Sequence, residues 1–441
     1  MLIRRPELAV FHFSGLAAVL ICAALVHYSR QALPPDITVF LGLCGAGFVL
    51  SLLGAGAVWH AGGTIGMKAV LLWCVVLRLV AVGGEPIYED DYFRYLWDGR
   101  QTVESGTPYA SVPSDAFLDE NDERWTDILD QINNPDIGTI YGPVNQYVFA
   151  LAYLIAPGSV FVLQVIMASA DLLLLLLLSL LLRDLGRTTL APVVLYGFSP
   201  LILKEFAMTA HPDVLMLTAL VASLLTWRRG YLPTTAVLLG VAVAAKVFAF
   251  VVAPLLLRWR WRSWLIFAAT VLALHFPLSG RFGGSAGLAA MAGEWLFNAP
   301  LYYLLLDSLD LRALKMTLFL VFAGLCTGYF FASRYHHTAP PAPPRGDWLY
   351  LAMLLAVPVL NPWYYPLVLV FAVIYPTVWA WLGSFTVLLA YATGLQLLQP
   401  GLQPYEQPAW VLWVEFGPVA VALLATALRP FLQKRLRQAS A

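Results

Sequence analysis

The sequence predicts an all-α, polytopic membrane protein with about 12 to 14 membrane segments. Of the 441 residues, 60% are hydrophobic and 12% are charged, which is about half the charged fraction of a soluble domain. Apolar runs of about 20 residues, the length of a membrane-spanning helix, recur along the whole chain. The acidic residues are concentrated instead: 14 of the 26 lie between Glu85 and Asp136, with only three arginines. We therefore divide the chain into three N-terminal membrane helices (1–83), an acidic outer loop (84–141) and a remaining helical bundle (142–441).

The first three apolar runs lie at 8–27, 36–59 and 67–83. Arg4 and Arg5 precede the first run, and no clear cleavage site follows it, so we interpret it as a retained helix and not as a signal peptide. Positive residues that flank membrane helices stay in the cytoplasm, which places Arg4, Arg5 and Lys68 inside. The third helix then leaves the membrane on the outer side, and the acidic loop follows it there.

The acidic loop is predicted to carry two short interfacial helices. The first runs from Asp91 to Glu104, and the second covers Asp119–Gln131, with Ser114 or Asp115 as its cap. Within the first helix, one face carries residues at positions i, i+3, i+4 and i+7, namely Asp91, Arg94, Tyr95 and Asp98.

The run after this loop, 143–156, is too short to span a membrane and is predicted to be re-entrant or interfacial. Further segments are expected at 159–182, 189–206, 213–228, 263–279, 312–333, 347–360, 363–381, 383–399 and 409–429. The run 233–257 has arginines at both ends, which predicts a hairpin of two half-helices broken near Lys246 or Pro254. A second outer loop is expected at 280–311 and an inner link at 334–345. No internal repeat is evident, which argues against a transporter built from duplicated halves.

The acidic triplet Glu89-Asp90-Asp91 is the first candidate site. It has two interpretations: a solvated loop start in which Asp90 caps the following helix, or a functional group that contains a general base or a metal ligand. Its position at a membrane exit, followed by Arg94 at helical spacing and by several aromatic residues, favours the second.

Three further groups of polar residues lie among the apolar runs. Lys204, Glu205, His211 and Asp213 fall within ten residues of one another, either in a wet loop or around a cavity. Lys246 lies in an apolar run, where a lysine costs about 2.5–3.5 kcal/mol, so it either snorkels, pairs or reaches a phosphate-binding pocket. The turn at 361–365, Asn-Pro-Trp-Tyr-Tyr, is typical of an interfacial aromatic belt or of a substrate-lining segment.

The motif Tyr88-Glu-Asp-Asp-Tyr-Phe-Arg-Tyr-Leu-Trp-Asp-Gly-Arg100, followed by Ser105-Gly-Thr-Pro-Tyr109, resembles the GT-C superfamily of membrane glycosyltransferases, which take sugars from polyprenyl-phosphate donors. The likeness is closest to the bacterial mannosyltransferases that use polyprenyl-phosphate-mannose. Shorter similarities continue at Tyr141-Gly-Pro143, Lys204 to Asp213, Lys246 and Pro362-Trp-Tyr. The chain departs from the family in two ways: three helices precede the acidic loop instead of one, and Tyr-Gly-Pro replaces the more frequent Tyr-Pro-Pro.

This resemblance implies a GT-C-like fold and an inverting transfer of a hexose, mannose-like, to a lipid or glycan acceptor. Asp91 is the expected general base, and Asp90 either assists it or holds a metal. The expected substrate- or phosphate-binding residues are Arg94, Arg100, Lys246, His211 and Asp213, and the expected stacking residues are Trp97, Trp363 and Tyr364. Glu89, Asp90 and Asp91 would suit Mg²⁺ or Mn²⁺, although a carboxylate base requires no metal. Membrane lipids are the other expected partners, no nucleic acid is expected, and the expected location is the bacterial inner membrane with the site facing the periplasm.

Two other classes of protein stay open at this point. A flippase for lipid-linked sugars or a secondary transporter would need charges along a two-sided path, whereas here they gather on one side. An O-antigen polymerase or ligase would be expected to have arginine-rich outer loops, whereas this loop is acidic.

Overall fold

The computed structural model describes residues 5–31, 36–279, 295–306, 308–333, 342–397 and 401–439, with side chains as far as Arg429. The regular structure of these residues is helical and contains no strand, apart from one isolated bridge between Phe297 and Val359. The all-α prediction is therefore confirmed. The residues 280–294 of the predicted second outer loop and 334–341 of the predicted inner link lie outside the described residues.

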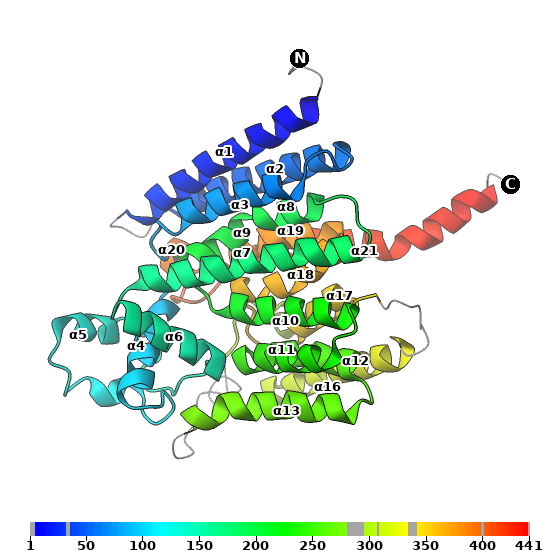
Figure 1. Cartoon of the computed structure of the whole chain (residues 1–441). Helices are drawn as coiled ribbons and strands as arrows, with labels where there is room; N and C mark the ends of the chain where they lie inside the picture. Colours follow the sequence, from blue (N-terminus) through cyan, green and yellow to red (C-terminus); the bar gives the residue numbers. More distant parts are fainter. Residues whose placement is uncertain are drawn as a thin grey trace.

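The three predicted N-terminal helices are present as α1 (Pro6–Ser29), α2 (Ile37–His60) and α3 (Met67–Ala81). They form the upper layer in Figure 1. A buried ion pair joins this layer to the bundle below: Arg78 of α3 lies 2.7 Å from Asp171 of α7, and both side chains are 1% exposed. Arg78 also donates to the carbonyl oxygen of Gly197, and the Tyr196 hydroxyl donates to Asp171. These bonds satisfy a charge pair that would otherwise be costly to bury.

The acidic loop carries α4 (Asp91–Glu104) and α5 (Glu123–Asp130), and α6 (Pro143–Ile155) follows it. The bounds of α4 are those predicted. The second helix begins later than predicted because Asp122 caps it, accepting a hydrogen bond from the Arg124 amide, whereas Ser114 and Asp115 lie in a separate 3-10 turn. In Figure 1, α4, α5 and α6 project at the left side of the bundle.

The central bundle contains both expected and unexpected breaks. Its elements are α7 (Val160–Asp184), α8 (Ala191–Gly197), α9 (Pro200–Ile202), a π-helical segment (Leu203–Met208), α10 (Asp213–Arg228), α11 (Leu232–Ala245), a 3-10 segment (Val247–Val252), α12 (Ala253–Leu257), α13 (Trp261–His275) and a 3-10 turn (Phe276–Leu278). The run 189–206, predicted as one helix, is bent by 43° at Pro200, which cannot donate a backbone hydrogen bond. The break predicted near Lys246 is found at Lys246, whose backbone is extended at φ −154° and ψ 129°.

The C-terminal part contains the predicted helix at 312–333, a last helix that is longer than predicted, and several shorter elements. They are α15 (Pro300–Leu305), α16 (Leu311–Ser333), α17 (Gly346–Ala356), a 3-10 turn (Pro362–Tyr364), α18 (Pro366–Ile374), α19 (Val378–Thr386), a 3-10 segment (Val387–Tyr391), α20 (Gly394–Leu397) and α21 (Ala409–Ala439). The predicted helix 363–381 is wrong because Pro376 ends α18 two residues earlier. The predicted helix 383–399 is also wrong, since this stretch contains the end of α19, a 3-10 segment and α20.

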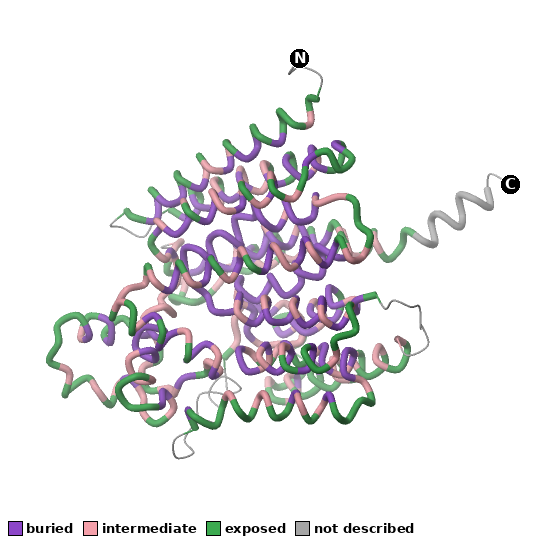
Figure 2. The backbone as a smooth tube through the Cα atoms, in the orientation of Figure 1, coloured by how far each residue is buried: buried purple, intermediate pink, exposed green. Residues whose placement is uncertain are grey.

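Six of the described helices are long and apolar enough to cross a membrane, or seven if the bent pair at 191–208 counts as one span. Six shorter apolar helices of 10–17 residues accompany them, so the predicted 12 to 14 segments are reached only when these are counted. Only 6% of the apolar window of α16 is buried. Figure 2 shows the exposed surface of such outer helices, which requires lipid around it.

The arginines of several connections that the sequence predicts to be cytoplasmic gather at one end of the bundle, here called the arginine end. Arg229 lies 2.6 Å from Asp184 at the end of α7, and Arg258 donates to the Ser333 carbonyl at the end of α16. The start of α10 lies at the opposite end, where Asp213 meets Lys246. Residues 247–257 therefore return along α11 toward the arginine end, as the predicted hairpin requires.

Candidate active site

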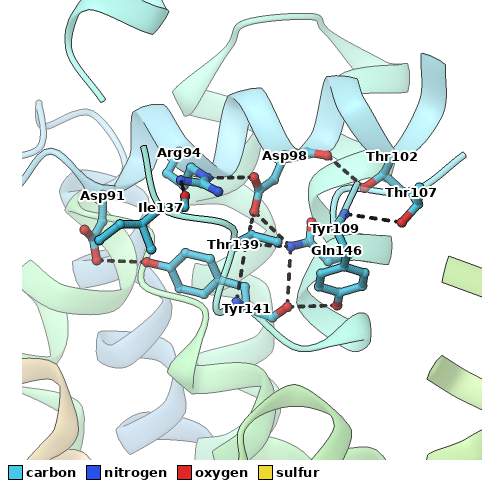
Figure 3. Close-up of polar contacts among 10 residues, drawn as sticks. All are labelled: Asp91, Arg94, Asp98, Thr102, Thr107, Tyr109, Ile137, Thr139, Tyr141 and Gln146. Atoms are coloured by element: carbon cyan, nitrogen blue, oxygen red, sulfur yellow. Dashed lines mark hydrogen bonds and ion pairs between the residues drawn. The ribbon is translucent and has the colours of Figure 1, made fainter. Parts of the chain in front are cut away.

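The acidic motif lies at the start of α4, where two carboxylates share one amide. The Asn133 side chain donates to Asp90 Oδ1 at 2.6 Å and to Asp91 Oδ1 at 3.1 Å. The Tyr141 hydroxyl donates to the other oxygen of Asp91 at 3.0 Å, as Figure 3 shows. Asp91 is thus held at both oxygens, by residues from two other parts of the chain.

The helix that carries Asp91 is fixed by hydrogen bonds to the carboxylate of Asp98, which is buried and 1% exposed. Asp98 accepts from Arg94 at 2.9 Å, from Gln146 at 2.8 Å and from the Thr139 hydroxyl, while Arg94 also donates to the Ile137 carbonyl (Figure 3). Arg94 therefore holds the loop segment 137–141 against α4.

Arg100 and Trp97 belong to the same structural layer of the acidic loop. Arg100 pairs with Glu104 at 2.9 Å and with Glu120 at 2.5 Å, and its guanidinium lies over the Trp125 ring. Trp97 is buried beside it. The structure does not bring Arg94, Arg100 or Trp97 into the group around Asp91 that is described next.

The site contains three groups of residues, called arms here. The first is Asp91 with Asn133 and Tyr141, and the second is Asp213 with Lys246. Lys246 Nζ lies 2.6 Å from Asp213 Oδ1, and its ammonium group lies 4.0 Å from the centre of the Tyr364 ring. The charge of Asp91 acts on both Asp213 and Tyr364. Asp213, Lys246 and Tyr364 thus form one group that lies within electrostatic reach of Asp91.

His211 and Trp363 form the third arm. Its ring stacks on Trp363 with the centroids 4.0 Å apart, and its Nδ1 lies 3.0 Å from the Tyr95 hydroxyl. Its Nε2 lies 3.3 Å from Glu205 Oε2 but outside hydrogen-bond geometry. His211 and Glu205 are both fully buried.

A buried cluster continues behind His211. Tyr391 donates to Glu205 Oε1 at 2.7 Å, and Lys204 donates to Glu205 at 3.3 Å and to the Tyr391 hydroxyl at 2.5 Å. The backbone here is unusual: Leu203–Met208 is π-helical, and Ala210 has a positive φ of 60°. Both features are rare, cost free energy and concentrate at functional sites.

A close backbone contact joins the Asp91 arm to the Lys246 arm. A Cβ added at Gly142 would lie 2.1 Å from the carbonyl oxygen of Ala244, and Asn145 donates to the Ala245 carbonyl at 3.0 Å. The turn that contains Tyr141 therefore packs directly on the end of α11, next to Lys246. A side chain at this position would therefore clash with the backbone of α11.

Burial and mutual repulsion raise the proton affinity of two acids in the motif. Burial, and then the neighbouring charge of Asp91, raise the pKa of Asp90 to about 6. Burial also raises the pKa of Glu89 well above its usual range, although Lys204 opposes this. Near neutral pH the motif therefore carries less than its formal negative charge.

The three consecutive carboxylates do not converge on one point that would suit a cation. Asp90 and Asp91 meet at Asn133, whereas Glu89 interacts with Tyr391 and Lys204. Within the described ranges, no three His, Cys, Asp or Glu side chains form a group that could hold a metal ion. The site residues thus do not fit the Mg²⁺ or Mn²⁺ considered from the sequence.

Two cavities lie away from these arms. One, of about 410 Å³, is an open pocket between α4, α5 and the start of α7, lined by Tyr92, Phe93 and Glu123 among others. The second, of about 500 Å³, lies near the arginine end and is lined by Arg258, Trp261 and Phe330 among others. Neither is lined by Asp91.

Sequence comparison agrees with the chemistry of this site. Residues 14–262 match the family described as alpha-(1->6)-mannopyranosyltransferase, N-terminal domain. The match includes the acidic motif, the buried cluster from Lys204 to Asp213, and Lys246, while the Trp363 turn lies beyond it. No curated protein and no solved structure matches the chain. The matched range covers more than half of the chain, so the protein belongs to the alpha-(1->6)-mannopyranosyltransferase family and is a membrane mannosyltransferase, a glycosyltransferase of the GT-C type.

Proposed function

We propose that this protein transfers mannose from a polyprenyl-phosphate donor to a hydroxyl group of a lipid or glycan acceptor, with Asp91 as the general base. One observation carries the proposal: Asp91, the Asp213–Lys246 pair and the His211–Trp363 stack come from four distant segments, and contacts of Tyr95 and of the turn at 141–142 hold them together. A carboxylate, a paired cation and aromatic faces are the groups that a sugar phosphate requires.

The reaction would be a direct displacement with inversion at the anomeric carbon. Asp91 accepts the proton of the acceptor hydroxyl while the acceptor oxygen forms a bond to that carbon. The bond between this carbon and the donor phosphate oxygen breaks, and its electron pair leaves with the phosphate. The hydrogen bonds from Asn133 and Tyr141 fix the carboxylate, so little reorientation is needed when the proton moves.

The departing phosphate gains charge, which a fixed cation would stabilise. Lys246 is the candidate because its side chain is 21% exposed and is held by Asp213, whereas Lys204 is fully buried behind His211. Trp363 and Tyr364 form the aromatic wall beside it and would contact the sugar or the prenyl chain. Asp90 accepts from the same Asn133 amide at 2.6 Å and would assist Asp91 by holding that amide in place.

The distribution of charge supports an active site that faces the periplasm of the bacterial inner membrane. The arginine end holds Arg229 and Arg258, and positive residues stay on the cytoplasmic side. Asp91 lies at the opposite end, where the acidic loop emerges. The substrate lipid would then enter from the outer leaflet.

The test compares Asp91→Asn with Asp119→Asn, a matched change at an exposed acid of the same loop. Transfer of mannose from polyprenyl-phosphate-mannose is measured in membrane vesicles that contain equal amounts of each protein. Asp91→Asn should lose at least about 100-fold in rate, and Asp119→Asn should keep the wild-type rate. Undiminished transfer by Asp91→Asn would remove Asp91 from the role of base.

A further inference from the structure

A chain of ionisable and hydroxyl side chains leads from Asp91 into the core of the protein. The Tyr141 hydroxyl bonds Asp91 at 3.0 Å, and the rings of Tyr141 and Tyr95 pack edge to face with their centroids 5.0 Å apart. The Tyr95 hydroxyl bonds His211 Nδ1 at 3.0 Å, and His211 Nε2 lies 3.3 Å from Glu205. Four links thus connect the half-buried Asp91 with the fully buried Glu205.

We propose that this chain is a proton relay, in which Tyr141, Tyr95 and His211 carry the proton that Asp91 has accepted to Glu205. The inference rests on the proposed transfer reaction, and it assigns a role to residues that the displacement itself does not require.

The donors and acceptors of these side chains support a relay, because all of its hydrogen bonds can form in either of two directions. A hydroxyl has one donor hydrogen, and a neutral imidazole has one donor and one acceptor nitrogen. When Asp91 is protonated, every link donates away from it, and His211 Nε2–H points to the Glu205 carboxylate. When Glu205 is protonated, every link donates the other way, and Asp91 is a carboxylate again.

The number of bonds to hydrogen stays the same when one arrangement changes into the other. One O–H bond breaks at Asp91 and one O–H bond forms at Glu205. Tyr141 and Tyr95 each give up one hydrogen and receive another, and His211 gains a hydrogen at Nδ1 and loses one at Nε2. Asp91 is thereby regenerated without exchange of its proton with water while donor and acceptor fill the site.

The surroundings of His211 and Glu205 fit this role. Charged or titratable groups surround His211: Tyr95 and Glu205 lie within 3.3 Å of its ring nitrogens, and the charges of Lys204 and Lys246 act on it. The unpartnered Nε2 of His211 is buried and directed at Glu205. This link and the contact between Tyr141 and Tyr95 are the two that a moving proton would strengthen. The π-helix and the strained Ala210 hold Glu205 and His211 in this relation.

The relay also has an exit. Tyr391 donates to Glu205 and interacts with Glu89, which is half-buried in the acidic loop. In the proposed relay, a proton on Glu205 leaves through Tyr391 toward Glu89. This assigns a role to Glu89 that differs from that of Asp91, two residues further along the chain.

The test removes a single hydroxyl from the middle of the relay. Tyr95→Phe keeps the ring that stacks on Phe149 and breaks the path between Tyr141 and His211. Its matched control is Tyr365→Phe, a buried tyrosine whose hydroxyl donates only to the Ala380 carbonyl. Transfer rates are measured in vesicles from pH 5.5 to 8.5, with and without added imidazole as a diffusible proton acceptor.

Tyr95→Phe should lower kcat by on the order of 100-fold, leave KM for the donor within about twofold, and recover part of its rate with imidazole. Tyr365→Phe should behave as wild type. If Tyr95→Phe is not recovered as a folded protein, Glu205→Gln is the second variant, with the same expected loss and the same rescue. A kcat close to wild type, or a loss that imidazole does not restore, overturns the relay. In either case Asp91→Asn stays inactive if the proposed function holds, so the two proposals fail separately.

Discussion

The Tyr141 hydroxyl donates a hydrogen bond to Asp91 Oδ2 at 3.0 Å, across 50 residues of sequence. Tyr141 stands in the turn that re-enters the bundle, and Asp91 is the first residue of the helix that leaves it. One bond therefore ties the entrance and the exit of the acidic loop together at the proposed base. The consequences of this arrangement can be measured.

Loss of the Tyr141 hydroxyl should slow transfer without unfolding the protein. A hydrogen bond to a charged group contributes about 1.5–3 kcal/mol, so Tyr141→Phe should reduce kcat about 10- to 100-fold. Tyr147→Phe is the control, because its hydroxyl donates to the Leu274 carbonyl at the exposed edge of α6. Equal rates for Tyr141→Phe and Tyr147→Phe would mean that this bond does not position the base.

A methyl group at position 142 should disturb the fold and the site together. Gly142→Ala would place Cβ 2.1 Å from the Ala244 carbonyl oxygen, and this backbone cannot move without displacing Lys246. We expect a lower melting temperature in detergent and a loss of transfer. Gly56→Ala on α2 has open space around its Cβ and should change neither. Wild-type stability of Gly142→Ala would show that the two backbones separate easily.

The Arg78–Asp171 pair should be the most sensitive charge pair in the bundle. Removing one partner of a buried pair costs about 3–5 kcal/mol because the other charge stays buried and unpaired. Asp171→Asn should therefore lower the free energy of unfolding strongly, as measured by denaturation in detergent. Asp184→Asn, which breaks the more exposed pair with Arg229, should cost only about 0–1 kcal/mol. Similar losses in the two variants would contradict the structural role assigned to Asp171.

The sequence predicted the elements whose signals are local. The bounds of α4 follow from an acid at its start and from Ser-Gly-Thr-Pro after its end, and the break at Lys246 follows from a charge inside an apolar run. Pro200 and Pro376 mark the bend and the end of α18 in the sequence. Because the residues on both sides of each proline are apolar, each run was predicted as one continuous helix.

The site was predicted less completely because its partners come from distant segments. Asn133 and Tyr391 are single polar residues in unremarkable surroundings, and nothing nearby in the sequence indicates that they reach Asp90 or Glu205. Arg100 and Glu104 stand at i,i+4 spacing and form a local ion pair. That spacing favours a structural role for Arg100 over the phosphate contact inferred from the resemblance.

Asp90 should make stability depend on pH. An acid with a raised pKa binds its proton more tightly in the folded state, so the folded protein loses stability as pH rises from about 4, its unfolded pKa, to about 6, its folded pKa. Asp90→Asn removes the charge but keeps a carbonyl oxygen that can accept from Asn133. The variant should therefore be more stable than wild type at pH 8, by at most about 3 kcal/mol, and equally stable near pH 4. Asp119→Asn, at an exposed position, should show no such difference between the two pH values. Melting temperatures of the three proteins in detergent at pH 4.5 and 8 decide the matter: a variant at position 90 that gains nothing at pH 8 would show that burial and Asp91 do not oppose the ionisation of Asp90.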